Sequence, residues 1–324
     1  MKINFKSRVS CFILIVLGLI FGFFIESLTD RSCYSGKLKY INPDLVCEDK
    51  MVISKKGYFG LRTKIEEYIE EKKELKQLDH FSLYFRDLQN GPTMGINEHE
   101  KFSPASLLKI PVLLTYLNLQ IDNPDILNTE IAFNNIYQNL NQYFLPKLSA
   151  QENTPYKISE LLNFMIKYSD NNSYYALRAY LNQNYPKEDL VKLTYIDLGL
   201  TDPRDINEQT LSVKSYSSIF VQLYHSSFFQ NKNLSEQALE ILNNTDFTEG
   251  ITQGIPNNID IAHKFGERTT EGISQLHDCG IVYYPDNPYL LCIMTRGPEF
   301  YLLSDIIGEV SKIVYDEVES RRID

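Results

Sequence analysis

The chain has 324 residues, of which 43% are hydrophobic and 23% are charged. A protein with this composition can bury a core, so a wholly disordered chain is excluded, and the length allows one large domain or two ordinary ones. The formal net charge is −10 and no basic cluster offsets it, which excludes a nucleic-acid partner because phosphate binding needs a basic face.

The amino terminus has the pattern of a membrane segment. Lys2, Lys6 and Arg8 precede an uncharged apolar run over residues 11–25. A basic flank before such a run keeps the amino terminus inside and directs the remainder outside. The expected order is a cytoplasmic amino terminus, a transmembrane anchor or signal segment, and a linker, over residues 1–8, 9–28 and 29–56.

Two fates of this segment remain open, an uncleaved anchor and a cleaved signal peptide. Cleavage needs small residues after the apolar run, whereas Phe23, Phe24 and Ile25 stand there. The sequence therefore favours a single-pass anchor in the cell membrane. Under either alternative the rest of the chain is expected to be extracytoplasmic.

Hydrophobic periodicity predicts the elements of the remaining residues. Apolar positions recur at helical spacing, as at Ile158, Leu161 and Leu162, or in short runs typical of strands. In chain order we expect a helix over 61–75, strands over 81–87 and 93–96, a helix over 103–119, mostly helical structure over 123–242 with a helix at 213–224, strands over 259–265, 272–284 and 289–295, and a helix over 300–320.

This order predicts an α+β fold. Strands from both ends of the chain can join in one antiparallel five-stranded sheet flanked by the terminal helices. The residues between them, about 103–250, then form an all-helical lobe of the same domain, which spans 57–324. A cleft between the lobe and the sheet is a natural place for a site.

Four cysteines are candidates for disulfides in an oxidising exterior. Cys33 and Cys47 flank a loop outside the membrane segment, and Cys279 and Cys292 lie symmetrically about a turn at Pro285 between two predicted strands. The alternative for the second pair is two small core residues on adjacent strands. No histidine stands at ligand spacing from a cysteine, so neither a metal nor another cofactor is predicted.

Ser106 and Lys109 form the first candidate for chemistry. Residues three apart share one face of a helix, so the hydroxyl and the amine can meet. A serine becomes a nucleophile when a base takes its proton, and a lysine serves as that base when burial or another cation lowers its pKa. The non-catalytic alternative is a surface lysine beside a small helical residue. Ser103 is expected to cap this helix and Pro111 to bend it.

Two more motifs follow along the chain. Ser169-Asp170-Asn171 comes at the end of an amphipathic helix, where a loop can project side chains into a cleft, and ordinary turn chemistry is its alternative. Lys264 and Gly266 stand in a predicted strand, where a buried lysine is costly unless it faces a cleft or a partner. The alternative is an edge strand with a solvated lysine.

The combination of these motifs carries more weight than any of them alone. Ser-x-x-Lys, Ser-Asp-Asn and Lys-x-Gly occur in this order, as in class A β-lactamases and penicillin-binding proteins. From about Gly57 to its carboxyl end the chain resembles this family of serine hydrolases. The resemblance implies the β-lactamase/transpeptidase-like fold and a β-lactam or a D-alanyl-D-alanine peptide of the cell wall as substrate.

The resemblance also implies catalytic roles. Ser106 would attack an amide carbonyl to form an acyl-enzyme, with Lys109 accepting its proton directly or through water. Ser169 would relay a proton to the leaving nitrogen, and Lys264 would polarise Ser169 and attract the substrate carboxylate. Neither His263 nor His277 has a nucleophile-elbow serine to serve, so both are expected to be strand residues.

Substrate binding is implied for four residues. Asn171 would hold Lys109 and the acyl group, and the backbone amides of Ser106 and Glu267 would form the oxyanion hole. Gly266 would let the substrate approach the strand closely. Phe265 stands where the family has a threonine or serine that binds the substrate carboxylate, and Arg268 is the candidate replacement.

A second departure concerns the hydrolysis of the acyl-enzyme. Class A β-lactamases activate the deacylating water with a glutamate four residues before an asparagine. Counting back from Asn207 gives Pro203, and Asp202, Asp205 and Glu208 stand near that place but not at it. Slow deacylation, typical of a penicillin-binding peptidase, is therefore the alternative to β-lactam hydrolysis and an antibiotic-resistance role. If the chain were instead a non-catalytic wall-binding domain or an anchored interaction protein, the three motifs would have no catalytic role.

Overall fold

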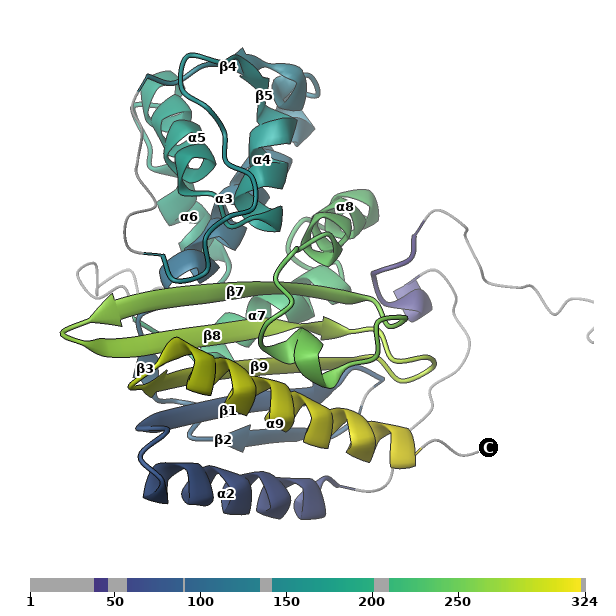
Figure 1. Ribbon diagram of the computed structural model, residues 1–324. Helices are drawn as coiled ribbons and strands as arrows, with labels where there is room; N and C mark the ends of the chain where they lie inside the picture. Colours follow the sequence, from purple (N-terminus) through teal and green to yellow (C-terminus); the bar gives the residue numbers. More distant parts are fainter. Residues whose placement is uncertain (1–37, 46–56, 90, 135–141, 201–209, 322–324) are drawn as a thin grey trace, which may run out of the picture.

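The computed structural model describes five stretches of the chain (Figure 1), residues 38–45, 57–89, 91–134, 142–200 and 210–321. The membrane segment predicted over 9–28 lies outside them, as do Cys33, Cys47 and most of the predicted linker. Within these stretches, no helix is both long enough and apolar enough to cross a membrane.

A five-stranded antiparallel sheet forms the centre of the molecule, in the order β2-β1-β9-β8-β7. It confirms the predicted pairing of strands from both ends of the chain. Alternation along the first strand buries Phe81, Leu83 and Phe85 on one face. The strands are β1 (His80–Asp87), β2 (Thr93–Ile96), β7 (Ile261–Thr270), β8 (Ile273–Val282) and β9 (Tyr289–Gly297).

The edge strand β7 is longer than the predicted strand over 259–265. Its extra residues are polar and give no hydrophobic signal, but they pair with β8 as far as the turn. The turn consists of Glu271 and Gly272, both in the left-handed region with φ of 53° and 81°. Two such residues form the tight turn whose twist matches a hairpin, so the turn extends the pairing and therefore the strand.

The two terminal helices cover one face of the sheet (Figure 1), as predicted. They are α2 (Phe59–Glu74) and α9 (Phe300–Ser320). Leu61, Ile65 and Ile69 recur at helical spacing on α2 and are buried against the sheet. This packing forms one of the two hydrophobic cores.

The helices between the strands lie on the other face (Figure 1) and form the second core. Two of these helices contact the sheet directly, so the helical residues do not all stand apart from it. The helices are α3 (Lys109–Asp122), α4 (Ile158–Lys167), α5 (Asn171–Asn184), α6 (Leu190–Asp197), α7 (Val213–Tyr224) and α8 (Lys232–Asn243), of which the last two contact the sheet. Short strands β3 (Lys101–Phe102), β4 (Glu130–Ile131), β5 (Tyr156–Lys157) and β6 (Leu211–Ser212) and short 3-10 turns η1 (Pro43–Leu45), η2 (Ala105–Leu108), η3 (Ile126–Asn128) and η4 (Ile251–Gly254) complete the described fold.

The single helix predicted over 103–119 is wrong at its start. A 3-10 turn, η2, precedes α3, because Ala105 has a left-handed φ of 49° that a helix cannot contain. Ser103 does not cap the helix. Pro111 is only the third residue of α3, where its missing N–H has no helical partner to lose, so the bend expected from it is not needed.

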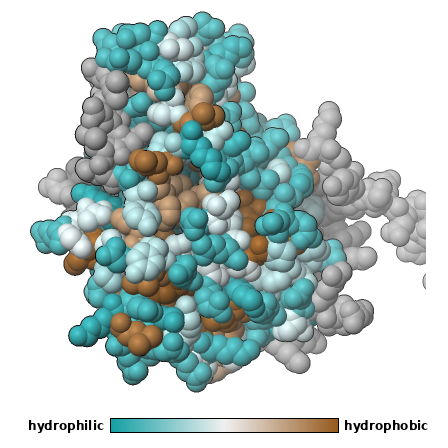
Figure 2. All heavy atoms as spheres, viewed as in Figure 1, coloured by the Kyte–Doolittle hydropathy of each residue, from teal (hydrophilic) through white to brown (hydrophobic). Residues whose placement is uncertain are grey.

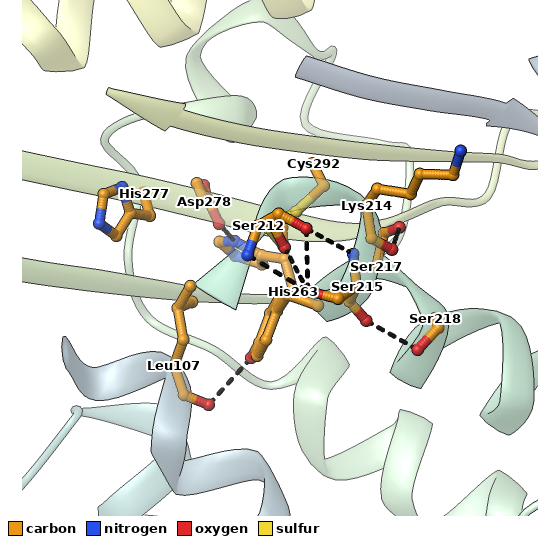
Figure 3. The surroundings of a disulfide bond; sticks show 12 residues. Leu107, Ser212, Lys214, Ser215, Ser217, Ser218, His263, His277, Asp278 and Cys292 are labelled. Atoms are coloured by element: carbon orange, nitrogen blue, oxygen red, sulfur yellow. Dashed lines mark hydrogen bonds and ion pairs between the residues drawn. A yellow bond between two sulfur atoms is a disulfide. The ribbon is translucent and has the colours of Figure 1, made fainter. Parts of the chain in front are cut away.

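A disulfide joins Cys279 and Cys292, which are directly paired across β8 and β9 and fully buried. Figure 3 shows its surroundings, including the first turn of α7 and the buried contact between His263 and Asp278. Cys279 also pairs with Lys264 of β7. Because paired residues of neighbouring strands point to the same face, the disulfide lies on the Lys264 side of the sheet.

Candidate active site

Ser106 lies in the η2 turn between the sheet and α3. The carbonyl oxygens of the next two residues are held from the helical side, since Tyr216 donates to Leu107 O at 3.0 Å and Tyr195 to Leu108 O at 3.4 Å. The Leu107 side chain is buried, whereas Ser106 is only half-buried. The turn is therefore fixed from behind and presents the Ser106 hydroxyl toward accessible space.

Lys109 connects the predicted catalytic groups. Its side chain is 2% exposed. Its Nζ lies 3.1 Å from Ser106 Oγ, 3.1 Å from Ser169 Oγ and 2.8 Å from Asn171 Oδ1. The Ser169 carbonyl oxygen is a fourth neighbour, at 2.5 Å. The structure thus brings together side chains from two separate parts of the sequence.

The environment of Lys109 favours a neutral amine. Burial lowers the pKa of Lys109 from 10.5 to about 7, although the carboxylates of Asp170 and Glu267 act in the opposite direction. An ammonium has three hydrogens for its four oxygen neighbours, whereas a neutral amine donates two and accepts one from a hydroxyl. This arrangement suits a base that takes a proton from a serine.

Ser169 lies at a strained point just before α5. It is fully buried and has a left-handed φ of 54°. Asp170 caps the helix, because its carboxylate accepts from Ser173 N at 2.9 Å, Ser173 Oγ at 2.6 Å and Ser149 Oγ at 2.5 Å. Asp170 is therefore the organiser of this loop, a role that the sequence signal of an N-cap followed by Ser173 could have revealed.

Lys264 approaches Ser169 from the sheet. Its side chain is fully buried, and its Nζ lies 3.0 Å from both Ser169 Oγ and the Phe265 carbonyl oxygen. Burial, together with the nearby Lys109, holds the pKa of Lys264 well below its usual range. Ser169 thus lies between two lysine amines, and protons can be exchanged among the three groups.

The structure gives the four predicted binding residues different surroundings. Asn171 contacts Lys109, as described above. Gly266 faces the η2 turn, where an added Cβ would lie 2.7 Å from Pro104 O, so its missing side chain makes room for the turn that carries Ser106. Arg268 is exposed and donates to Ser103 Oγ at 3.2 Å, away from the lysines.

The Glu267 side chain does not point into open space. It is 8% exposed, and its carboxylate accepts from the backbone amides of Tyr143 at 3.0 Å and Phe144 at 3.0 Å. Burial raises the pKa of Glu267, while these amides and the two lysines oppose the rise. No local sequence pattern indicates this contact, because the partners of Glu267 are distant in sequence and are backbone groups.

Phe265 belongs to an aromatic cluster beneath the site. Its ring is stacked on Phe247 with centroids 3.8 Å apart and lies 6.1 Å from Phe144 in an edge-on arrangement. Lys264 Nζ lies 4.1 Å from the centroid of the Phe265 ring. The residue that departs from the family pattern therefore has a packing role of its own.

Phe265→Thr, which restores the family's hydroxyl, is expected to destabilise the protein. Phe265 is 3% exposed, and removing its ring leaves a cavity beside Phe247, at a cost of about 3 kcal/mol. Urea unfolding followed by circular dichroism measures the change. Phe59→Thr is the control, because Phe59 is 88% exposed and should change the free energy of unfolding by less than about 0.5 kcal/mol. Equal stabilities of the two variants would contradict the packing role.

The hydrogen bonds of the two strand histidines do not involve the side chains of Ser106 or Ser169. His263 Nδ1 lies 2.9 Å from Asp278 Oδ1 inside the sheet. His277 Nε2 lies 2.9 Å from the Ser103 carbonyl oxygen, and its Nδ1 accepts from Thr295 N at 3.3 Å. Burial lowers the pKa of His277 to about 4, so the ring is neutral. These contacts are structural and agree with their expected place in strands.

The acidic loop considered for deacylation, with Asp202, Asp205 and Glu208, lies outside the described residues. Among the residues that are described, no group of three or more His, Cys, Asp or Glu side chains could hold a metal ion.

Comparison with known proteins agrees with the geometry. A family model described as the beta-lactamase enzyme family matches residues 60–318. A beta-lactamase from Chitinophaga pinensis is 20% identical with a TM-score of 0.65, covering 80% of this chain and 99% of that one. A class A beta-lactamase from Mycobacterium abscessus is 18% identical with a TM-score of 0.64, covering 78% and 98%.

The structure of PBP-A is also similar. It is 19% identical with a TM-score of 0.64, covering 81% of this chain and 97% of that one. A PBP-A variant, solved as an acyl-enzyme complex with penicillin G, is 20% identical with a TM-score of 0.63, covering 81% and 97%. No curated protein matches the chain. At these identities the solved structures establish the fold.

Proposed function

Because this chain belongs to the beta-lactamase enzyme family, we propose that it is a serine hydrolase that opens a β-lactam ring through an acyl-enzyme on Ser106. The observation that carries the proposal is the position of Lys109 Nζ, 3.1 Å from the hydroxyl oxygens of both Ser106 and Ser169. One buried amine therefore lies within hydrogen-bond distance of a nucleophile and of a proton relay.

The proposed acylation needs only the side chains of Ser106, Lys109, Ser169 and Lys264. Neutral Lys109 takes the proton of Ser106 as Oγ attacks the carbonyl carbon of the β-lactam. The C–N bond then breaks, and Ser169 gives its proton to the leaving nitrogen. Lys109 returns a proton to Ser169, so the enzyme side chains end uncharged and Ser106 carries an ester. Lys264 holds Ser169 in place through the 3.0 Å contact between Nζ and Oγ.

Binding of the substrate is proposed to use groups around this centre. The backbone amides of Ser106 and Glu267 would stabilise the oxyanion, and Asn171 would orient both Lys109 and the acyl group. Lys264 would attract the substrate carboxylate. Arg268 would supply the donor that Phe265 lacks, after leaving its contact with Ser103.

Slow hydrolysis of the ester is the second candidate, with a penicillin-binding or D-alanyl-D-alanine peptidase role. It is favoured by the state of the two buried carboxylates near Lys109. Asp170 and Glu267 both accept hydrogen bonds from backbone amides of the folded chain. Neither is therefore free to activate a water molecule.

The proposed location is the outer face of the cell membrane, on the strength of the basic flank and apolar run at the amino terminus.

Incubation with benzylpenicillin followed by intact-protein mass spectrometry tests the proposal. We expect an adduct with the mass of the whole antibiotic, located on the peptide that contains Ser106, because ring opening loses no atoms. An adduct that persists for hours supports the penicillin-binding candidate, and rapid return to the free mass supports a β-lactamase. A folded protein that forms no adduct and does not open a chromogenic β-lactam would contradict both and leave the non-catalytic wall-binding alternative.

A further inference from the structure

A short segment of the loop before β5 crosses from the helical lobe to β7 (Figure 1). We call residues 142–144 the strap. The Glu267 carboxylate holds it with both oxygens, since Oε2 accepts from Tyr143 N at 3.0 Å and Oε1 from Phe144 N at 3.0 Å. A buried carboxylate that accepts two amides makes charge-assisted bonds, which are stronger than neutral ones.

Aromatic packing holds the same segment from below. Phe144 lies edge-on to Phe265 and to Phe247, with centroids 6.1 Å and 5.1 Å away. Tyr143 is stacked on Phe300, the first residue of α9, at 5.0 Å. Phe265 and Glu267 are two residues apart on a strand and so share one face of β7. The face of β7 that carries Phe265, in place of the family's threonine or serine, is therefore the face that contacts the strap.

The strap also reaches the catalytic centre. Gln142 Nε2 lies 3.5 Å from the Ser169 carbonyl oxygen, which is the same oxygen that Lys109 contacts. Gln142 Oε1 is buried and has no hydrogen-bond partner within the described part of the chain. A buried amide oxygen without a partner is costly, so other contacts must hold the strap for Gln142 to keep this position. Figure 2 shows an apolar patch where the helical lobe meets the sheet on this side of the molecule.

We propose that Glu267 is a positioning residue, which holds the strap on β7 so that Gln142 lies beside Ser169 as part of the substrate-binding wall. Tyr143, whose side chain is exposed, would contact the apolar part of a bound substrate. This inference rests on the proposed function for its substrate, whereas the strap contact rests on the structure alone.

Amide hydrogen exchange measures the strap contact without any substrate. Glu267→Gln removes the charge and leaves one acceptor oxygen, and Glu267→Asp keeps the charge but is one methylene shorter. We expect both to raise the exchange rates of the Tyr143 and Phe144 amides about tenfold. Glu236→Gln is the matched control. Glu236 is also a buried glutamate that accepts backbone amides, those of Lys39, Tyr40 and Ile41, on the helical lobe.

The second measurement is the rate of acylation by benzylpenicillin. In both Glu267 variants the concentration for half-maximal rate should rise about tenfold. The limiting rate in Glu267→Asp should change by a smaller factor than this concentration, because the charge near Lys109 is kept. Glu236→Gln should raise exchange only at Lys39, Tyr40 and Ile41 and should leave acylation unchanged.

Two outcomes would overturn the inference. Unchanged exchange at Tyr143 and Phe144 in both Glu267 variants would show that the carboxylate does not hold the strap. Raised exchange with an unchanged concentration dependence would show that the strap does not position the substrate. If the unsubstituted protein is not acylated at all, the proposed function fails, and amide exchange alone decides whether Glu267 holds the strap.

Discussion

Ser106→Ala is expected to abolish covalent labelling by penicillin and to lower the rate of β-lactam opening by a factor of about 10⁴ or more. The hydroxyl is the only group in the proposed mechanism that forms a bond to the substrate. Lys109, Ser169 and Lys264 contact one another without Ser106, so the remaining site should keep its shape. Intact-protein mass spectrometry detects the adduct, and a chromogenic β-lactam measures the rate.

The control removes a different serine hydroxyl. Ser218 lies on α7, where its Oγ donates to the Ser215 carbonyl oxygen at 2.7 Å. Ser218→Ala should therefore form the adduct at the rate of the unsubstituted protein. An adduct that survives in Ser106→Ala would identify another nucleophile and contradict the proposed mechanism. A Ser106→Ala protein that unfolds more easily would show instead that the serine is structural.

Lys109→Met is expected to lower the acylation rate by a factor of about 10³, because among the described residues the Lys109 amine alone lies within hydrogen-bond distance of Ser106 Oγ to take its proton. In the unsubstituted protein, the rate should fall as the pH drops below about 7. The pKa of Lys109 is about 7, and only the neutral amine can act as a base. Acylation rates measured from pH 5 to 9 test this dependence.

Lys109→Met is also expected to raise the free energy of unfolding at neutral pH, by on the order of 2 kcal/mol. The ordinary pKa of lysine is 10.5 and that of folded Lys109 is about 7, so between these values the unfolded chain binds a proton that the folded chain does not. The free energy of unfolding therefore rises with pH in this window, by about 1.4 kcal/mol per pH unit for one lysine. Methionine cannot be protonated and removes this cost.

Urea unfolding between pH 7 and 9 measures the difference. The slope of the free energy of unfolding against pH should be smaller in Lys109→Met than in the unsubstituted protein. Lys192→Met, at an exposed position of α6, should change neither acylation nor slope. Identical slopes for Lys109→Met and the unsubstituted protein would contradict the neutral buried amine.

Local patterns in the amino-acid sequence were enough to predict the arrangement of the fold. Periodic apolar positions gave the terminal helices and the paired strands, because a face that must be buried repeats with the period of its own element. The order of elements then predicted one sheet built from both ends of the chain. The spacing of Ser106 and Lys109 predicted that they meet, although they do so across the junction of η2 and α3 rather than within one helix.

Features that depend on groups distant in sequence are visible only in the folded chain. The left-handed Ala105, the strap held by Glu267 and the place of Phe265 in an aromatic cluster have no local pattern. The lowered pKa of Lys109 also depends on groups distant in sequence. It arises from removal of water by segments that approach only in the folded chain, and local sequence contains no information on how completely a side chain is desolvated.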